Sequence, residues 1–161
     1  MKKKMNVGLV FPAAGVLALA AELLIVNGRL EQLNILTYLL AIGIIPAAIL
    51  FVSMLLYGAV SKGKAVTAYV LAIGMALVFS GVMLLYCGSA ITPELVDTIL
   101  ANSVTSETTQ VSMTAASAGD NIQSVLIFAA FAGMGAFLGS RIGRKKAPAA
   151  PAAEQDEYDN L

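Results

Sequence analysis

The residues able to do chemistry in this chain are few and lie far apart in the sequence. Glu22 is the only acidic or basic residue inside a long apolar stretch, and Cys87 is the only cysteine among 161 residues. A carboxyl group within a membrane span can serve an ion or proton pathway, whereas a thiol becomes a nucleophile only when a base or a cation activates it. Histidine is absent, which removes the side chain best suited to acid–base catalysis near neutral pH. We therefore expect no enzyme activity and no catalytic, metal or cofactor site, and Glu22 is the candidate intramembrane ion or proton site.

Two interpretations of Glu22 stay open from the sequence. Ala14, Ala18 and Glu22 recur at a spacing of four residues, which places the carboxyl group in a row of small residues that would face a neighbouring helix. In that position it would belong to a proton- or cation-linked site. The simpler interpretation places the carboxyl group near the headgroups, in water or paired with Arg29, because a charge near the end of a span costs little.

The composition indicates that lipid surrounds most of the chain. Hydrophobic residues make up 58% of it, charged residues only 12%, and the mean hydropathy is +0.83. Soluble proteins carry about 25% charged residues, and a chain this short cannot bury so much apolar surface in one soluble core. Lipid offers no hydrogen-bonding partner to the backbone, and a helix satisfies its own groups. The sequence therefore predicts an all-α membrane protein.

Four apolar segments are long enough to cross a bilayer, whose hydrocarbon core of about 30 Å needs roughly 20 helical residues. They lie at about 7–26, 35–60, 65–87 and 122–140. We expect them to form a four-transmembrane-helix bundle within residues 1–146. Residues 88–121 would then be an outer loop and residues 147–161, rich in Ala, Pro and acids, a disordered cytoplasmic tail.

The basic residues predict the orientation of these spans. Nine of the ten would share one side of a four-span chain, and Arg29 would stand alone on the other. The nine are Lys2, Lys3, Lys4, Lys62, Lys64, Arg141, Arg144, Lys145 and Lys146. Because basic flanks are retained in the cytoplasm, both termini are predicted to be cytoplasmic, in the plasma membrane. Ala18-Leu19-Ala20 also fits a signal-peptide cleavage site, but the apolar run continues to Val26 and favours an uncleaved first span.

The outer loop contains a signal for a short amphipathic helix. Thr92 is suited to cap it, Pro93 to occupy its first position, and Glu94 to interact with its amino end. Its apolar face would lie on the membrane surface and would carry Leu95, Val96, Ile99 and Leu100. Asp120 and Gln123 form a capping-box pattern, which predicts the start of the fourth spanning helix.

Small residues mark the surfaces on which membrane helices pack closely. In the third span one row has a spacing of four, and a second row, of glycines, has a spacing of seven on a roughly opposite face. Two such faces predict that this helix is central. The fourth span has its own glycine row, which would pack inside the bundle or join two protomers. The three rows comprise Ala72, Ala76 and Ser80; Gly74, Gly81 and Gly88; and Gly135 and Gly139.

Pro46 stands in the middle of the second span. It lacks the N–H group that would bond the preceding turn, and its ring crowds the carbonyl of Ile42, so we expect a kink there.

The expected function follows from two features of the sequence, the lack of a recognisable catalytic, metal or cofactor motif and the clear four-span topology. We expect a non-catalytic accessory or assembly subunit that contacts a protein partner or further copies of itself within the lipid bilayer. The formal net charge is zero, so nucleic acid is not an expected partner. The alternative is a small oligomeric transporter or channel, linked to protons or cations, in which Glu22 lines the path near the Pro46 kink.

Overall fold

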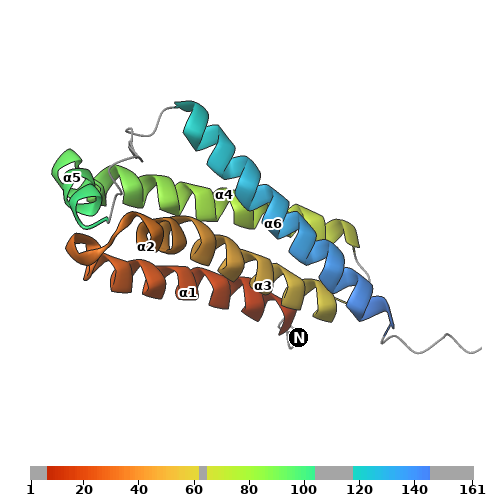
Figure 1. Cartoon of the computed structure of the whole chain (residues 1–161). Coiled ribbons are helices and arrows are strands. Elements are labelled where there is room, and N and C mark those ends of the chain that lie inside the picture. The colour runs from red at the N-terminus through yellow and green to blue at the C-terminus, as the bar shows by residue number, and fades with distance from the viewer. Residues whose placement is uncertain (1–6, 62–64, 104–117, 146–161) are drawn as a thin grey trace, which may run out of the picture.

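The computed structural model describes residues 7–61, 65–103 and 118–145 of the chain (Figure 1). All regular secondary structure within these ranges is helical. Its elements are η1 (Val7–Leu9), α1 (Val10–Asn27), η2 (Leu30–Gln32), α2 (Ile35–Leu39), η3 (Leu40–Ile44), α3 (Ile45–Val60), α4 (Ala65–Ala90), α5 (Pro93–Ala101) and α6 (Ala118–Lys145). The acidic tail, most of the basic residues and most of the Ser/Thr-rich loop lie outside the described residues.

Four helical segments are long and apolar enough to span a membrane, as the composition predicts. They are Val10–Asn27, Ile35–Val60, Val66–Ala90 and Ile122–Gly143, and their mean hydropathy lies between 1.8 and 2.7. The second segment is a continuous run of α2, η3 and α3. The all-helical fold with four apolar helices is thus confirmed.

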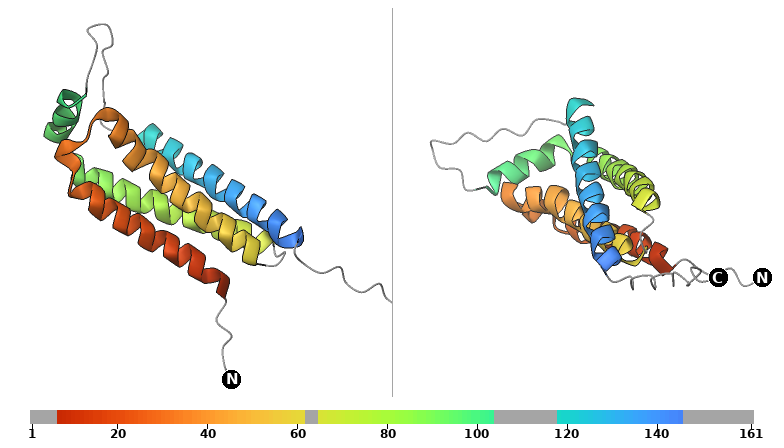
Figure 2. Two further views of the ribbon diagram at one scale, coloured as in Figure 1. Left: turned by 60° about the horizontal axis from the view of Figure 1, so that its bottom comes forward. Right: turned by 90° about the vertical axis from the view of Figure 1, so that its right-hand side faces the viewer.

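Helix α3 is the central element of the bundle. It packs against α1, α4 and α6, and α1 and α6 lie on either side of it (Figure 2). The third spanning helix, α4, was expected to be central because of two close-packing faces; it contacts α1, α3 and α6, but the second of these faces has no neighbour among the described residues. A Cβ atom added at Gly74, Gly81 or Gly88 would meet nothing within 4 Å, so the described residues leave this second face of α4 open.

The closest packing joins α6 to α3 through backbone contacts at glycines. A Cβ atom on Gly135 would lie 2.5 Å from the carbonyl oxygen of Phe51, and one on Gly139 would overlap the carbonyl oxygen of Leu55. The contact is reciprocal, since a Cβ atom on Gly58 of α3 would lie 2.8 Å from the carbonyl oxygen of Ala136. Glycine has no side chain and therefore allows the two helices to approach this closely.

The other face of α6 packs on α4 through alanines and phenylalanines. The core there includes Ala72 and Ala76 of α4 with Ala132 of α6, all almost fully buried. Beside them Phe79 and Phe128 meet edge to face, with ring centroids 6.3 Å apart. This is a favourable arrangement for aromatic rings.

A π-helical turn, η3, lies directly before Pro46. The amide of Ile45 bonds the carbonyl of Leu40, five residues back rather than four. Since Pro46 has no N–H and its ring crowds the preceding turn, a widened turn accommodates it, and such turns are a recognised cause of helix bending.

Two predicted helix ends differ from the structure. Helix α6 begins at Ala118, so Asp120 lies in its first turn and the predicted Asp120–Gln123 cap is wrong. Ala118 favours helical geometry, and the glycine that follows it weakens the helix without ending it. Helix α4 continues past Cys87 to Ala90, because the first obstacle to helical geometry is Pro93, which disfavours that geometry in the residue before it.

Adding one methyl group at Gly139 should destabilise the bundle by about 1–3 kcal/mol, the usual cost of overpacking. The methyl group would overlap the Leu55 carbonyl and separate α6 from α3. The measurement is the free energy of unfolding of Gly139→Ala in detergent. Gly133→Ala is the matched control, because nothing lies within 4 Å of its added Cβ, and it should be neutral or more stable by up to about 1 kcal/mol. Equal effects of the two changes would contradict the packing argument.

Candidate functional site

Glu22 lies at the edge of the buried face of α1. That face contains Leu19, Leu23 and Val26, and Glu22 is three residues after the first of these and four before the last. Both of its carboxyl oxygens are buried and have no hydrogen-bonding partner among the described residues. The carboxyl group therefore reaches neither Arg29 nor the protein surface in this structure, in contrast to the simpler interpretation of the sequence.

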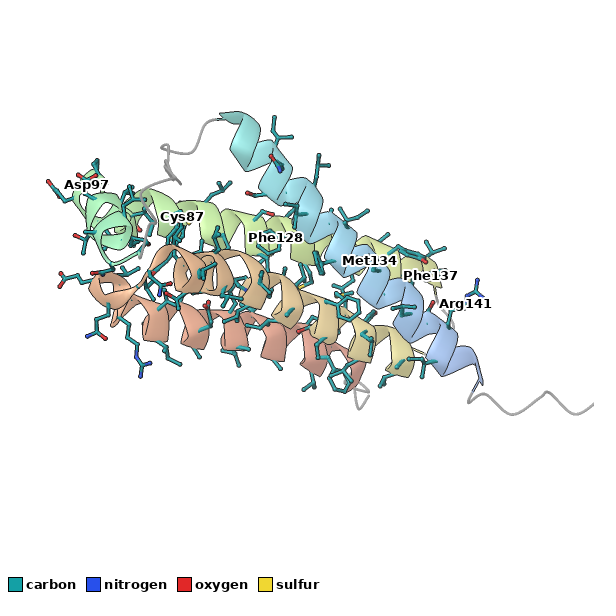
Figure 3. All side chains as sticks on the ribbon, viewed as in Figure 1. Cys87, Asp97, Phe128, Met134, Phe137 and Arg141 are labelled. Carbon is teal, nitrogen blue, oxygen red and sulfur yellow. The ribbon has the colours of Figure 1, made fainter. Side chains whose placement is uncertain are left out.

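The side chain of Tyr86, on α4, lies within electrostatic range of Glu22, but the two groups form no hydrogen bond. Its hydroxyl group is likewise buried and has no hydrogen-bonding partner among the described residues. Cys87, next to it in α4 and near α5 in Figure 3, and Tyr38 of α2 interact with Tyr86 in the same way. We call these four residues, Glu22, Tyr38, Tyr86 and Cys87, the polar cluster.

Pro46 lies at the same level of the bundle as Glu22. Gly15 of α1 touches Ser53 of α3, and the two helices run in opposite directions (Figure 2). Seven residues forward from Gly15 reach Glu22, and seven back from Ser53 reach Pro46, each a rise of about 10 Å at 1.5 Å per residue. The buried carboxyl group thus lies level with the helix irregularity around Pro46.

Helix α5 closes the bundle at the end that holds the polar cluster. Thr92 accepts a hydrogen bond from the amide of Leu95 and so caps the helix. At the other end of α5, Asn102 donates to the backbone oxygens of Glu31, at 2.8 Å, and Leu33, at 3.2 Å. Ser103 accepts from the amide of Ile35 at 2.9 Å. These bonds tie α5 to η2 and α2, elements about 70 residues earlier in the chain.

A polar cavity of about 450 Å³ lies under this connection. Arg29 is the basic residue that lines it, together with Asn27, Gly28, Leu30, Glu31, Gln32, Ala90, Thr92 and Leu95. Arg29 and Glu31 are both exposed, and their opposite charges give the cavity no net preference for anions or cations.

An apolar groove of about 430 Å³ runs between α1 and α3. Ala14 and Ala18 line it and remain exposed, so the small-residue row before Glu22 borders a groove. It does not pack tightly against a neighbouring helix, because Gly15 and Leu19 form the contact face of α1 instead.

The predicted packing residues fall at two contacts. Gly135 and Gly139 lie against the backbone of α3, whereas Ala72, Ala76 and Ser80 are buried along α4. The Oγ of Ser80 is buried and has no partner among the described residues.

Sequence reasoning named Glu22 but missed Tyr86 and Tyr38. Each tyrosine stands near the end of its span, where tyrosines are common at membrane interfaces. The spacing along one chain does not reveal which tyrosine lies opposite the carboxyl group. The one sequence signal for Tyr38 and Tyr86 was that both stand near the end of the bundle that also holds Glu22.

The polar cluster combines one carboxyl group, two phenols and one thiol, and the described residues bring together no set of ligands for a metal. Within residues 7–61, 65–103 and 118–145, no three His, Cys, Asp or Glu side chains come together as metal ligands. Comparison with family models, curated proteins and solved structures found no match to this chain.

Removing the side chain of Asn102 should loosen α5 from the bundle. Asn102→Ala loses two hydrogen bonds, worth about 1–2 kcal/mol together, so amides of α5 and η2 should exchange their hydrogens roughly 5- to 30-fold faster. Hydrogen exchange followed by mass spectrometry measures this. Asp97→Ala is the control, since Asp97 is exposed on α5 and points away from the bundle (Figure 3). Unchanged exchange in Asn102→Ala would mean that apolar contacts alone hold α5.

Proposed function

We propose that this chain is a non-catalytic subunit of a membrane complex and that it acts through contacts between helices. In this proposal it lies in the plasma membrane with both termini in the cytoplasm and α5 outside. The observation that carries the proposal is the open glycine face of α4, formed by Gly74, Gly81 and Gly88.

Glycine on a lipid-facing helix surface needs a reason. Each glycine within a helix costs about 1 kcal/mol relative to alanine, and lipid gains nothing from the missing side chain. On α6 the same type of residue supports the close contact with α3, whereas on α4 the added Cβ atoms would meet open space. A close contact with a helix from another chain would explain why glycine stands at these positions.

The spacing of these glycines favours one geometry for the contact. Residues seven apart stay on one face when two helices cross at the shallow angle of a left-handed coil. Large exposed side chains flank the row, among them Ile73, Leu77 and Leu85. They would form the ridges on either side of a partner helix seated on the glycines.

The orientation rests on charge. In a chain of four spans, Lys2 to Lys4, Lys62, Lys64 and the basic residues from Arg141 to Lys146 would share one side, and Arg29 would stand alone on the other. This asymmetry favours a cytoplasmic location for both termini. The polar cluster and α5 would then lie toward the outside.

Native mass spectrometry of the protein purified in mild detergent tests the subunit proposal. A second polypeptide should accompany the chain in a fixed ratio, and Gly81→Leu should remove it by filling the open face. Gly133→Leu is the control, because it adds the same side chain to α6 at a position with free space around it. A homogeneous species of this chain alone, unchanged by Gly81→Leu, would contradict the proposal.

A second candidate function is a small proton- or cation-linked transporter, which would act as an oligomer because four helices leave little room for a path. The buried and unpartnered carboxyl group of Glu22 favours it, since ionisable groups inside membranes commonly serve ion or proton pathways.

Flux measurements in proteoliposomes test the second candidate. Glu22→Gln should abolish pH-dependent flux and leave the fold intact, because the amide keeps the shape of the carboxyl group without its proton exchange. Glu94→Gln is the control, since Glu94 is exposed in α5 and its change should leave flux as in the wild type. Wild-type vesicles without flux would eliminate this candidate.

A further inference from the structure

We propose that the polar cavity at the α5 end of the bundle binds the zwitterionic headgroup of a phospholipid, with the phosphate at Arg29 and the ammonium group at Glu31. The proposal rests on the placement of the four long helices in a bilayer, which is part of the proposed function, and needs no contact with a partner chain. It assigns a ligand to a cavity that the subunit and transporter functions leave unused.

The cavity lies where two of the candidate spans end. Asn27, the last residue of α1, and Ala90, the last residue of α4, both line it. Thr92 and Leu95 border it at the start of α5, which lies at the same end of the bundle (Figure 1). In a bilayer the ends of spanning helices stand in the headgroup layer, outside a hydrocarbon core of about 30 Å. The cavity would therefore lie at the level of the lipid headgroups.

Arg29 and Glu31 supply the two opposite charges of the cavity. Both are exposed, and neither side chain forms an ion pair or a hydrogen bond with another described residue. A ligand with a single charge would be attracted by one of them and repelled by the other. A group that carries a phosphate and an ammonium on one short chain meets an opposite charge at each end. The planar guanidinium of Arg29 suits a phosphate, because it can form two parallel hydrogen bonds with it.

The backbone that carries these two charges is held in place by the fold itself. The amide of Arg29 donates to the carbonyl oxygen of Val26 at 2.9 Å. Nδ2 of Asn102, at the end of α5, donates to the carbonyl oxygen of Glu31 at 2.8 Å. Because these bonds fix the backbone at both positions, a ligand would need to order only the two side chains, which lowers the cost of binding.

Exposed apolar side chains beside the cavity favour a lipid over a free zwitterion. Leu24 and Ile25, in the helical turn before Asn27, are 75% and 63% exposed. The acyl chains of a lipid whose headgroup lies in the cavity can contact these side chains within the hydrocarbon core. A free zwitterion in water has no apolar part to place there.

Native mass spectrometry of the full chain released from nanodiscs tests this site. The nanodiscs contain equal amounts of phosphatidylethanolamine, which is zwitterionic, and phosphatidylglycerol, which has the phosphate without an ammonium group. The ratio of ethanolamine to glycerol lipid retained should fall roughly 2- to 5-fold in Glu31→Gln, the range expected for an ion pair between exposed groups. Glu94→Gln is the control and should keep the wild-type ratio, because Glu94 is exposed on α5 and does not line the cavity.

Arg29 has its own pair of variants in the same measurement. Arg29→Gln should lower the retention of the ethanolamine lipid by a similar factor, roughly 2- to 5-fold, because the phosphate loses its counter-charge. Arg29→Lys keeps the charge and should retain more of this lipid than Arg29→Gln. The side chains of Arg29 and Glu31 are exposed, so these variants should fold as the wild type does.

Equal lipid ratios in Glu31→Gln and Glu94→Gln would overturn the proposal, and so would equal retention in Arg29→Gln and Arg29→Lys. Displacement of the retained lipid by an equal concentration of soluble phosphoethanolamine would also overturn it, because a free zwitterion would then be the ligand. A partner polypeptide appears at a different mass in the same spectra, so the failure of the subunit proposal is distinguishable from the failure of this one.

Discussion

The bundle depends on one steric constraint, which is that α6 and α3 touch backbone to backbone. Gly135, Gly139 and Gly143 on α6 and Gly58 on α3 leave no room for side chains between the two helices. In lipid no hydrophobic force drives helices together, so such close contacts carry much of the association energy. Helix α1 packs mainly on α3 and helix α4 mainly on α6, so the α3–α6 pair is the support on which the other two long helices pack.

The two ends of the bundle differ in the kind of contact that holds them. Toward the α5 end, Asn102 donates to backbone oxygens of the segment before α2, and Ser103 accepts from the first amide of α2. The π turn and Pro46 lie in the same half, level with Glu22. Toward the other end, the α3–α6 contact is close and regular, and a T-shaped pair joins Phe51 to Phe131 with ring centroids 6.5 Å apart. The irregular helix geometry and the unpartnered polar groups Glu22 and Tyr86 thus share one half of the bundle.

Much of this fold was predictable because few folds suit a chain with four apolar segments long enough to span a membrane. Apolar length alone locates the four long helices, and the α5 segment carries its own start signal in Thr92-Pro93. The sequence did not predict which helices pack against each other, because the glycine rows of α4 and α6 look alike in it. One of them, on α6, faces α3, and the other, on α4, faces outward. Spacing shows that a face is smooth but does not show which helix covers it.

For this protein the sequence by itself determined the helical class, the number of long apolar helices and the single acid among them, since these follow from local composition and length. Only the tertiary structure decided that α3 packs against α1, α4 and α6, and that the carboxyl oxygens of Glu22 are buried without a hydrogen-bonding partner among the described residues. Those features depend on the rotation of each helix about its own axis. That rotation is set by contacts between residues far apart in the chain, so no local pattern contains it.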